Sequence, residues 1–386
     1  MSNSSDSKQP APATAELEKS LAWVRPVVRQ QSAYHVADAG GLIKLDAMEN
    51  PYQLPDELKA ELQNKLAQAE LNRYPDPSAS SLRTKLGEVM QVPEGKSIVL
   101  GNGSDELIQM LAMAVADTNK ANTEKANAEK EVSLLSFDPG FVMYKMISDF
   151  SGINYVGVPL REDFSVDMDT TRKAIEKHQP TLIFIAYPNN PSANCFDEGD
   201  IEEIISIAPG MVVLDEAYNP FAQATFMDHL SRYDNLLVMR TVSKMGLAGL
   251  RLGLLCGHPS IINEIDKVRL PYNINILTQL TAEFVLDNMT VLDRQAASIR
   301  EDRASLLQSM NAITGLEVFP SQANFILFRV LGRSADDVFD SIKQSGVLIK
   351  NMKADAGPIK NCLRVTVGTP DENAAFISAL NRAMAV

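Results

Sequence analysis

Seven short apolar segments alternate with stretches of helical spacing through much of the chain. Each segment is apolar along its whole length, which is the pattern of strands that are covered by helices on both faces. A repeated strand–helix–strand order of this kind predicts an α/β fold with a mostly parallel sheet of about seven strands. The expected strands are residues 97–100, 132–137, 153–160, 181–187, 211–218, 236–241 and 253–257.

The pattern changes after Pro259. A nearly Pro- and Gly-free stretch, residues 278–311, predicts one long connecting helix. Strands and helices of mixed order then predict a smaller α+β domain, with strands at 323–330, 347–350 and 362–368 and helices at 335–344 and from about 372. The expected organisation is a flexible arm (1–23), a segment that packs with the small domain (24–45), a large domain (46–277) and the small domain (278–386), with a solvated connection at 118–131.

Composition narrows the classes of function. The 386 residues include 36 Lys and Arg against 49 Asp and Glu, a net charge of −13, which disfavours nucleic acid and anionic membranes as partners. No apolar stretch reaches the roughly 18 residues of a membrane span, and the first residues lack the apolar core of a signal peptide. Three cysteines, Cys195, Cys256 and Cys362, form no CxxC pair. We therefore expect a soluble cytoplasmic protein with reduced thiols.

Several common catalytic motifs are absent from the sequence. It contains no GxxxxGK[ST], HExxH or GxSxG motif. The four histidines, His35, His178, His229 and His258, do not pair at the spacing of metal ligands. The sequence therefore predicts neither a metal site nor a serine triad.

Polar clusters instead follow the expected strands, at the edge where open α/β sheets bind their ligands. The clusters are GNGSDE after the strand at 97–100, YPNNPSAN after 181–187, DEAYNP at the end of 211–218 and TVSKMGLAGLRLG after 236–241. Each cluster alone is a weak signal, because a strand-end carboxylate or an exposed lysine is common.

Together and in this order, the clusters resemble the fold type I aminotransferases, which use pyridoxal 5′-phosphate. Asn190, Asp215, Tyr218, Lys244 and Arg251 match the cofactor-binding residues of that family. The resemblance implies that the Lys244 amine condenses with the cofactor aldehyde and that Asp215 keeps the pyridine nitrogen protonated. It also implies that Asn190 and Tyr218 donate hydrogen bonds to the phenolic oxygen of the ring.

The cofactor phosphate needs several donors. The resemblance implies that the backbone N–H groups of Gly103, Ser104 and Asp105, at the start of a helix, bind this phosphate. Ser243 adds a hydroxyl and Arg251 a bidentate guanidinium. Phe141, in DPGFVMY, matches the aromatic ring that stacks on the pyridine.

Other motifs resemble the histidinol-phosphate aminotransferase branch of the family, from about residue 24 to the end. They are LDAMENPY (45–52), NRYPDP (72–77), SQANFILFR (321–329) and LRVTVGTPDEN (363–373). The branch implies amino-group transfer between histidinol phosphate and 2-oxoglutarate, with glutamate as the second product, in histidine biosynthesis.

The same resemblance implies the substrate contacts. Arg364 would bind the substrate phosphate in one half-reaction and the glutamate carboxylate in the other, with Tyr52 and Asn190 as further contacts. Tyr74 matches a tyrosine that reaches the cofactor phosphate of the neighbouring subunit, which implies a homodimer with shared active sites.

Two positions depart from the family pattern. PSA (residues 191–193) replaces the usual PTG, and alanine lacks the freedom of glycine at positive φ. Lys350 stands where many relatives carry a second anion-binding arginine, so the charge is kept and the bidentate geometry is lost.

Three alternatives remain open at the level of sequence. Two keep the cofactor: an aromatic amino-acid aminotransferase and a threonine-phosphate decarboxylase on the same scaffold. The third is a cofactor-sensing regulator, which the acidic charge and the lack of a helix-turn-helix segment disfavour.

Overall fold

The computed structural model describes residues 15–33, 38–116 and 132–385, so the predicted connection at 118–131 lies outside the described residues. The chain forms two compact units, residues 1–38 and 39–386. The first unit contains two short helices, α1 (Ala15–Leu21) and α2 (Pro26–Arg29). The predicted packing of residues 24–45 with the small domain stays a prediction.

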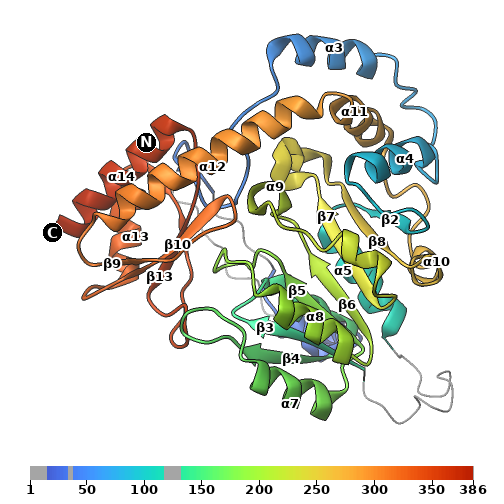
Figure 1. The fold of residues 1–386 in the computed structure, drawn as a ribbon, viewed down its shortest axis with the longest axis horizontal. Coiled ribbons are helices and arrows are strands. Elements are labelled where there is room, and N and C mark those ends of the chain that lie inside the picture. The colour runs from blue at the N-terminus through green and yellow to red at the C-terminus, as the bar shows by residue number, and fades with distance from the viewer. Residues whose placement is uncertain (1–14, 34–37, 117–131, 386) are drawn as a thin grey trace. The chain divides into compact units, whose positions relative to one another are not determined.

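A seven-stranded sheet forms the centre of the second unit (Figure 1). Its strand order is β2-β8-β7-β6-β5-β3-β4, and β8 runs antiparallel to both of its neighbours, whereas the other neighbouring pairs are parallel. The predicted mostly parallel sheet is therefore confirmed. The strands are β2 (Ser97–Gly101), β3 (Ser133–Asp138), β4 (Asn154–Pro159), β5 (Leu182–Ala186), β6 (Met211–Asp215), β7 (Leu236–Thr241) and β8 (Gly253–Gly257).

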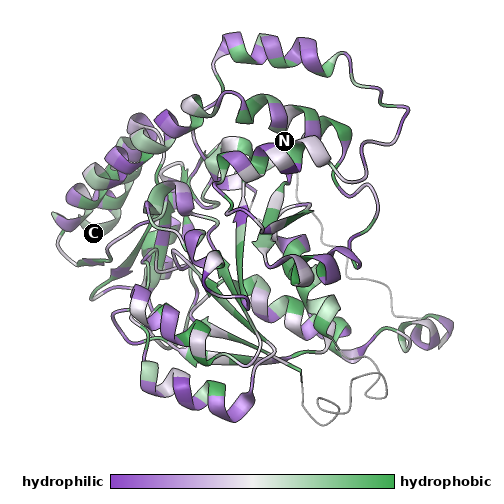
Figure 2. Ribbon diagram, turned by 45° about the vertical axis from the view of Figure 1, so that its right-hand side comes forward, coloured by the Kyte–Doolittle hydropathy of each residue, from purple (hydrophilic) through white to green (hydrophobic). Residues whose placement is uncertain are grey.

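Helices cover both faces of this sheet, which explains why its interior strands are apolar along their length, whereas the edge strand β4 is partly exposed. On β6, Val212 and Leu214 belong to one apolar cluster with residues of α4, α7 and α8, whereas Val213 belongs to another with residues of α5, α6 and α10. Figure 2 shows the strands largely green and purple residues on the outer helices. The covering helices are α4 (Ser80–Val89), α5 (Ser104–Val115), α6 (Val142–Ser151), α7 (Met168–His178), α8 (Glu198–Ile207) and α10 (Pro259–Asp266). Two further helices of this part, α3 (Asp56–Leu66) and α9 (Asn219–Ala222), pack on the helices that follow α10.

The predicted single helix over 278–311 is wrong in one respect, because the structure contains two helices there. These are α11 (Ile276–Leu286) and α12 (Met289–Asn311). The break falls at Asp287 and Asn288, and the Asn288 side chain donates to the carbonyl of Phe284 at 2.9 Å. Such side-chain bonds to the backbone compete with helix continuation. The connecting role is kept, because Leu292 of α12 belongs to the core of the large sheet and its later residues to the core of the small sheet.

A four-stranded antiparallel sheet forms the smaller part of the second unit, in the order β12-β13-β10-β9. The expected strand at 347–350 is two short strands, and the first of these, β11, pairs in parallel with β1. The predicted fold class, a large α/β part with a smaller α+β part, is confirmed. The elements are β1 (Ile43–Lys44), β9 (Leu316–Val318), β10 (Phe325–Val330), α13 (Ala335–Gln344), β11 (Val347–Leu348), β12 (Lys350–Asn351), β13 (Cys362–Thr366) and α14 (Pro370–Ala385).

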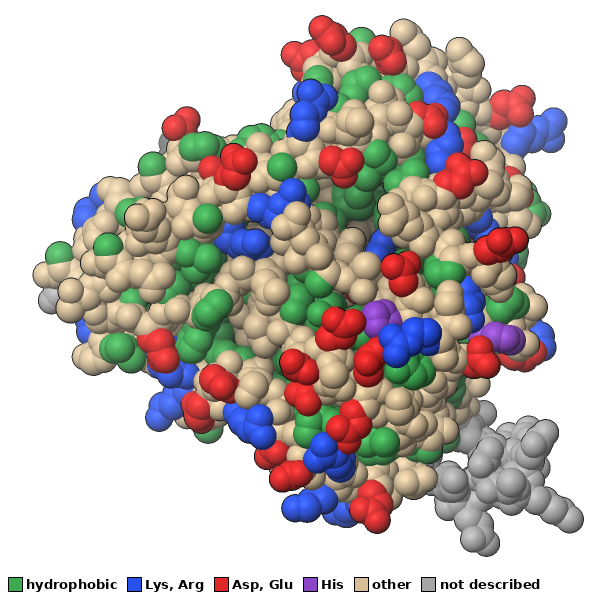
Figure 3. Space-filling view, in the orientation of Figure 1, with side chains coloured by type: hydrophobic (Ala, Val, Ile, Leu, Met, Phe, Trp, Pro, Cys, Tyr) green, Lys and Arg blue, Asp and Glu red, His purple; other side chains and the backbone are tan. Residues whose placement is uncertain are grey.

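Charges of both signs share the molecular surface. On the face drawn in Figure 3, Asp and Glu side chains are interspersed with Lys and Arg. Among the described residues, no helix is both long and apolar enough to cross a bilayer.

Candidate active site

Side chains from the ends of three neighbouring strands meet in one pocket. Asn190 follows β5, Asp215 ends β6, and Lys244 lies on the π-helical turn η2 (Ser243–Leu247) after β7. The pairing register explains this convergence, because it sets Asp215 opposite Ala186 on β5 and Met239 on β7. Nine predicted site residues line the pocket: Ser104, Asp105, Phe141, Asn190, Asp215, Tyr218, Ser243, Lys244 and Arg251.

Lys244 carries the amine of the pocket. Its Nζ donates a hydrogen bond to the carbonyl of Ala47 at 3.3 Å and lies 5.8 Å from the centre of the Tyr218 ring. Burial, and then the positive charge of Arg364, lowers the pKa of Lys244 to about 8. About a tenth of this amine is therefore uncharged at pH 7, far more than for an ordinary lysine, and the neutral form is the one that a nucleophile or general base requires.

Asp215 is the buried acid of the pocket, with 4% of its surface exposed. Its Oδ2 accepts a hydrogen bond from the hydroxyl of Tyr144 at 2.8 Å, and its Oδ1 accepts one from the backbone N–H of Ala217 at 3.1 Å. Burial raises the pKa of Asp215 to about 6. The carboxylate is thus charged at neutral pH in a site that excludes water, where a cationic ring nitrogen would be a favourable partner.

A buried network links Asn190, Tyr218 and Arg364. The Asn190 amide donates to the Tyr218 hydroxyl at 3.1 Å, and its carbonyl oxygen accepts from Arg364 Nη1 at 2.6 Å. Arg364 Nη2 also donates to the backbone carbonyl of Asp46 at 3.1 Å. Arg364 comes from β13 of the small sheet, so this network connects the two sheets of the second unit.

The other end of the pocket brings a helix start and a guanidinium together, two groups that could hold an anion. Helix α5 begins at Ser104, and its N-cap Gly103 has a φ of 87°. A Cβ at position 103 would lie 2.5 Å from Arg251 Nη2, so only glycine lets the guanidinium approach the N–H groups of the helix start. Arg251 also lies 3.4 Å from the Asp105 carboxylate, a side-chain contact that the sequence did not predict.

Five predicted site residues do not line the pocket: Gly103, Arg364, Tyr52, Lys350 and Tyr74. The Tyr52 hydroxyl donates to Asp302 at 3.1 Å. Lys350 is exposed on β12 and is the direct cross-strand partner of Arg364, so both side chains leave the same face of the small sheet. Tyr74 is 80% exposed, and its ring stacks on Tyr272 with a centroid distance of 4.4 Å.

The turn in which PSA replaces PTG keeps the conformation of a glycine turn. Ala193 has a φ of 67°, in the left-handed region. Its carbonyl accepts a hydrogen bond from the backbone N–H of Gln322 at 2.7 Å, which ties the turn to the segment before β10. The alanine therefore adopts the positive φ at a cost that glycine would avoid.

Sequence reasoning missed three residues. Tyr144 holds Asp215, Thr241 lines the pocket and accepts from the backbone N–H of Ser243 at 3.1 Å, and Met48 lines the pocket near Lys244. A usable signal existed for Tyr144, because it follows Phe141 by three residues at a helix start, a spacing that sets two side chains on one face. Nothing in the local sequence marks Met48.

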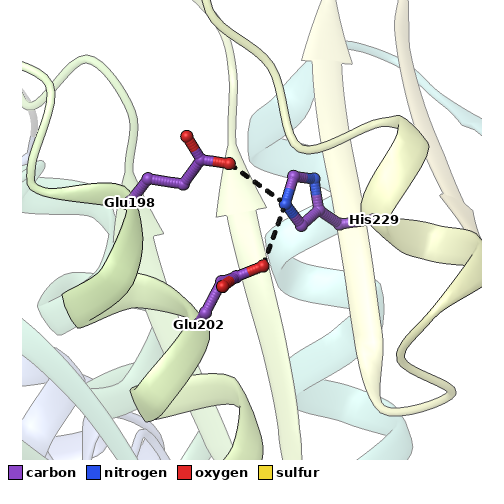
Figure 4. A group of neighbouring side chains, drawn as sticks. All are labelled: Glu198, Glu202 and His229. Carbon is purple, nitrogen blue, oxygen red and sulfur yellow. Dashed lines mark ion pairs between the residues drawn. The ribbon is translucent and has the colours of Figure 1, made fainter.

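Away from this pocket, three possible metal ligands come together that the sequence pattern left scattered (Figure 4). Glu198 and Glu202 lie one turn apart on α8, and the Nε2 of His229 is 3.2 Å from a carboxylate oxygen of each. Arg232 also contacts Glu202, at 2.6 Å. When His229 is protonated, these contacts are ion pairs that join α8 to the 3₁₀ turn η1 (Asp228–Ser231).

Known proteins are similar to this chain in sequence and in fold. The family model Aminotransferase class I and II matches residues 41–380. Histidinol-phosphate aminotransferase 2 of Nitrosococcus oceani is 50% identical over 358 residues, 93% of this chain and 96% of that protein. Histidinol-phosphate aminotransferase of Chromobacterium violaceum is 48% identical over 359 residues, 93% of this chain and 97% of that protein.

Solved structures agree in fold. The histidinol-phosphate aminotransferase of Clostridium acetobutylicum superposes with a TM-score of 0.78 at 20% identity, covering 89% of this chain and 99% of that one. The Sinorhizobium meliloti enzyme of that name, in complex with pyridoxal-5′-phosphate, gives a TM-score of 0.79 at 20% identity, covering 93% of this chain and 97% of that one.

Proposed function

The chain belongs to the class I and II aminotransferases and, within them, to the histidinol-phosphate aminotransferase family, and from this premise we propose its reaction. The protein transfers an amino group between L-histidinol phosphate and 2-oxoglutarate, giving imidazole acetol phosphate and L-glutamate, with pyridoxal 5′-phosphate as cofactor. The observation that carries the proposal is the meeting of Lys244 and Asp215 in one pocket whose far end is an anion site.

The donor set fits the cofactor. The N–H groups at the start of α5, the Ser243 hydroxyl and Arg251 would hold its phosphate, because the Gly103 backbone leaves room for the guanidinium beside the helix start. Asp215 would hold the pyridine nitrogen, and Phe141 would stack on the ring. Asn190 and Tyr218 would contact the phenolic oxygen.

When bound, pyridoxal 5′-phosphate supplies an aldehyde that condenses with amines and a ring that accepts electrons from the substrate carbon. The Lys244 amine, whose pKa burial lowers to about 8, would take the proton from that carbon and deliver a proton to the cofactor carbon that carried the aldehyde. Asp215, charged above its pKa of about 6, would keep a proton on the ring nitrogen. The two substrates use the same pocket in turn.

Substrate binding draws on the small sheet. The Arg364 guanidinium donates to Asn190 and to Asp46, and these hydrogen bonds hold it in position. This guanidinium would bind the phosphate of histidinol phosphate or the distal carboxylate of glutamate. Tyr52 and Lys350 would add a hydroxyl and a second positive charge to this anion site.

We also propose that the protein is a homodimer. Tyr74 and Tyr272 form an exposed stacked pair, and the large apolar side chains Leu71 and Leu270 are 71% and 70% exposed. Exposed apolar groups of this size favour burial against another surface. In the proposed dimer, Tyr74 reaches the cofactor phosphate of the second subunit.

The reaction is tested by comparing histidinol phosphate with phenylalanine as amino donors, with 2-oxoglutarate as acceptor. A phosphate-directed anion site predicts a much larger kcat/KM for histidinol phosphate. Equal values for the two donors would refute the proposal, and release of carbon dioxide from threonine phosphate would favour the decarboxylase alternative.

A further inference from the structure

Met48 has an unusual backbone for its residue type. Its φ is 53°, in the left-handed region that a side chain of this size rarely occupies. It also lines the pocket that contains Lys244, Asn190 and Phe141. An unfavourable backbone conformation persists only where the surrounding structure maintains it, and such conformations cluster at functional sites. The conformation of Met48 at the pocket therefore points to a function for its side chain.

Two hydrogen bonds from the small sheet hold this conformation. The backbone N–H of Met48 donates to the Thr366 hydroxyl at 2.9 Å, and its carbonyl accepts from the Asn324 amide at 3.1 Å. Thr366 lies on β13, two residues after Arg364. The carbonyl of the preceding Ala47 accepts from Lys244 Nζ at 3.3 Å. The carbonyl of Asp46 accepts from Arg364, so the two residues before Met48 contact the Lys244 amine and the Arg364 guanidinium.

The side chain of Met48 is apolar and adaptable. It is partly buried and packs against the apolar cluster that contains Tyr218 and Phe325. A substrate that contacts both Lys244 and Arg364 would lie close to residues 46–48. A flexible apolar side chain of this size can pack against a flat ring, and a short alkyl chain offers it less surface to contact.

We propose that Met48 is a specificity-determining residue, whose side chain forms the apolar wall on which the imidazole ring of the amino donor packs. Glutamate has no ring and gains little from this wall. The inference rests on the proposed function and deepens it, because it explains how one anion site can serve two substrates while a second contact favours one of them.

The test measures KM for histidinol phosphate and for glutamate in Met48→Ala. Loss of the contact raises KM for histidinol phosphate on the order of tenfold and leaves KM for glutamate within about twofold. Met48→Leu, which keeps an apolar side chain of similar size, restores most of the difference. Met384→Ala is the matched control, since Met384 packs against the same apolar cluster from α14 and does not line the pocket.

Met48→Asn distinguishes the effect of the apolar side chain from the effect of the backbone conformation. Asparagine tolerates positive φ and removes the apolar side chain, so it should fold and lose the preference as Met48→Ala does. Wild-type KM values in Met48→Asn, or equal changes for both substrates in Met48→Ala, would overturn the inference. A wild type that does not turn over histidinol phosphate would instead overturn the proposed function on which it rests.

Discussion

The two ends of the pocket are built in different ways. The proposed cofactor end comes from the ends of adjacent strands of one sheet, where the pairing register sets Asp215 opposite its neighbours. The proposed substrate end combines Arg364 of β13 with residues 46–52 and with Asp302 of α12, segments that lie far apart in the sequence. The pairing of the strands fixes the positions of the residues at the first end. The positions of the residues at the second end depend on how separate elements pack together.

This difference has a chemical counterpart. Asp215 is held by two donors that suit its charged form, so the cofactor end is ready to bind. At the substrate end, Tyr52 donates to Asp302, and the Arg364 guanidinium donates to Asn190. We expect substrate binding to exchange partners at that end and to leave the cofactor end unchanged.

The largest effect is expected for Lys244→Ala. Loss of the amine removes both the attachment of the cofactor and the proton transfer, so activity should fall on the order of a thousandfold or more. The visible absorption of the bound cofactor should disappear as well. Lys145→Ala, which removes an exposed lysine paired with Asp149, is the control and should keep both. Retention of the absorption by Lys244→Ala would contradict the assignment.

Arg364→Ala tests the substrate end and should impair both half-reactions by about a hundredfold. The reason is the loss of charge-assisted hydrogen bonds to the phosphate and to the carboxylate. Single-turnover rates with histidinol phosphate and with 2-oxoglutarate check the two halves separately. Arg329→Ala, on the neighbouring β10, removes a guanidinium that pairs with Glu317 and should leave both rates unchanged. Loss confined to one half-reaction would contradict a shared anion site.

The pH dependence of cofactor capture tests whether the two ends are coupled. Only the neutral amine of Lys244 condenses, so the capture rate of the cofactor-free protein should rise about tenfold per pH unit and level off above the pKa of about 8. Because the Arg364 cation helps to lower this pKa, Arg364→Ala should move the plateau to higher pH. An unchanged plateau would show that the two ends act independently.

Tyr144→Phe tests the hydrogen bond that Tyr144 donates to Asp215 at the proposed cofactor end. It removes the hydroxyl that donates to Asp215 at 2.8 Å, so the pKa of Asp215 should rise and the acid limb of the kcat/KM profile should move to higher pH. We expect kcat/KM to fall by about tenfold at neutral pH. Tyr155→Phe, which loses a hydrogen bond to Asp138 at 3.0 Å, is the matched control. A loss without any shift of the acid limb would indicate a packing role only.

The smallest effect is expected for Lys350→Arg. The bidentate guanidinium, directly across from Arg364, should lower KM for histidinol phosphate by about threefold. Lys353→Arg, in the loop after β12, should change nothing. If neither substitution changes KM for histidinol phosphate, the assignment of Lys350 to the substrate site is wrong.

The same contrast explains how much the sequence could predict. Lys244 and Asp215 follow apolar strands directly, so local motifs and the strand-end rule were enough to group them. The conformation of Met48 depends on Thr366 and Asn324, which are 318 and 276 residues away in the chain, and no local pattern encodes it. The break between α11 and α12 was also missed, because Asp287 and Asn288 are only weakly unfavourable in a helix and tertiary contacts decide the outcome.

One measurement tests the central claim most directly. The protein is loaded with one equivalent of pyridoxal 5′-phosphate, and histidinol phosphate is added without an acceptor. The account predicts that the visible absorption of the cofactor is lost with release of one equivalent of keto product, and that 2-oxoglutarate restores the absorption with release of one equivalent of glutamate. An absorption that does not respond to histidinol phosphate, or that 2-oxoglutarate fails to restore, would contradict it.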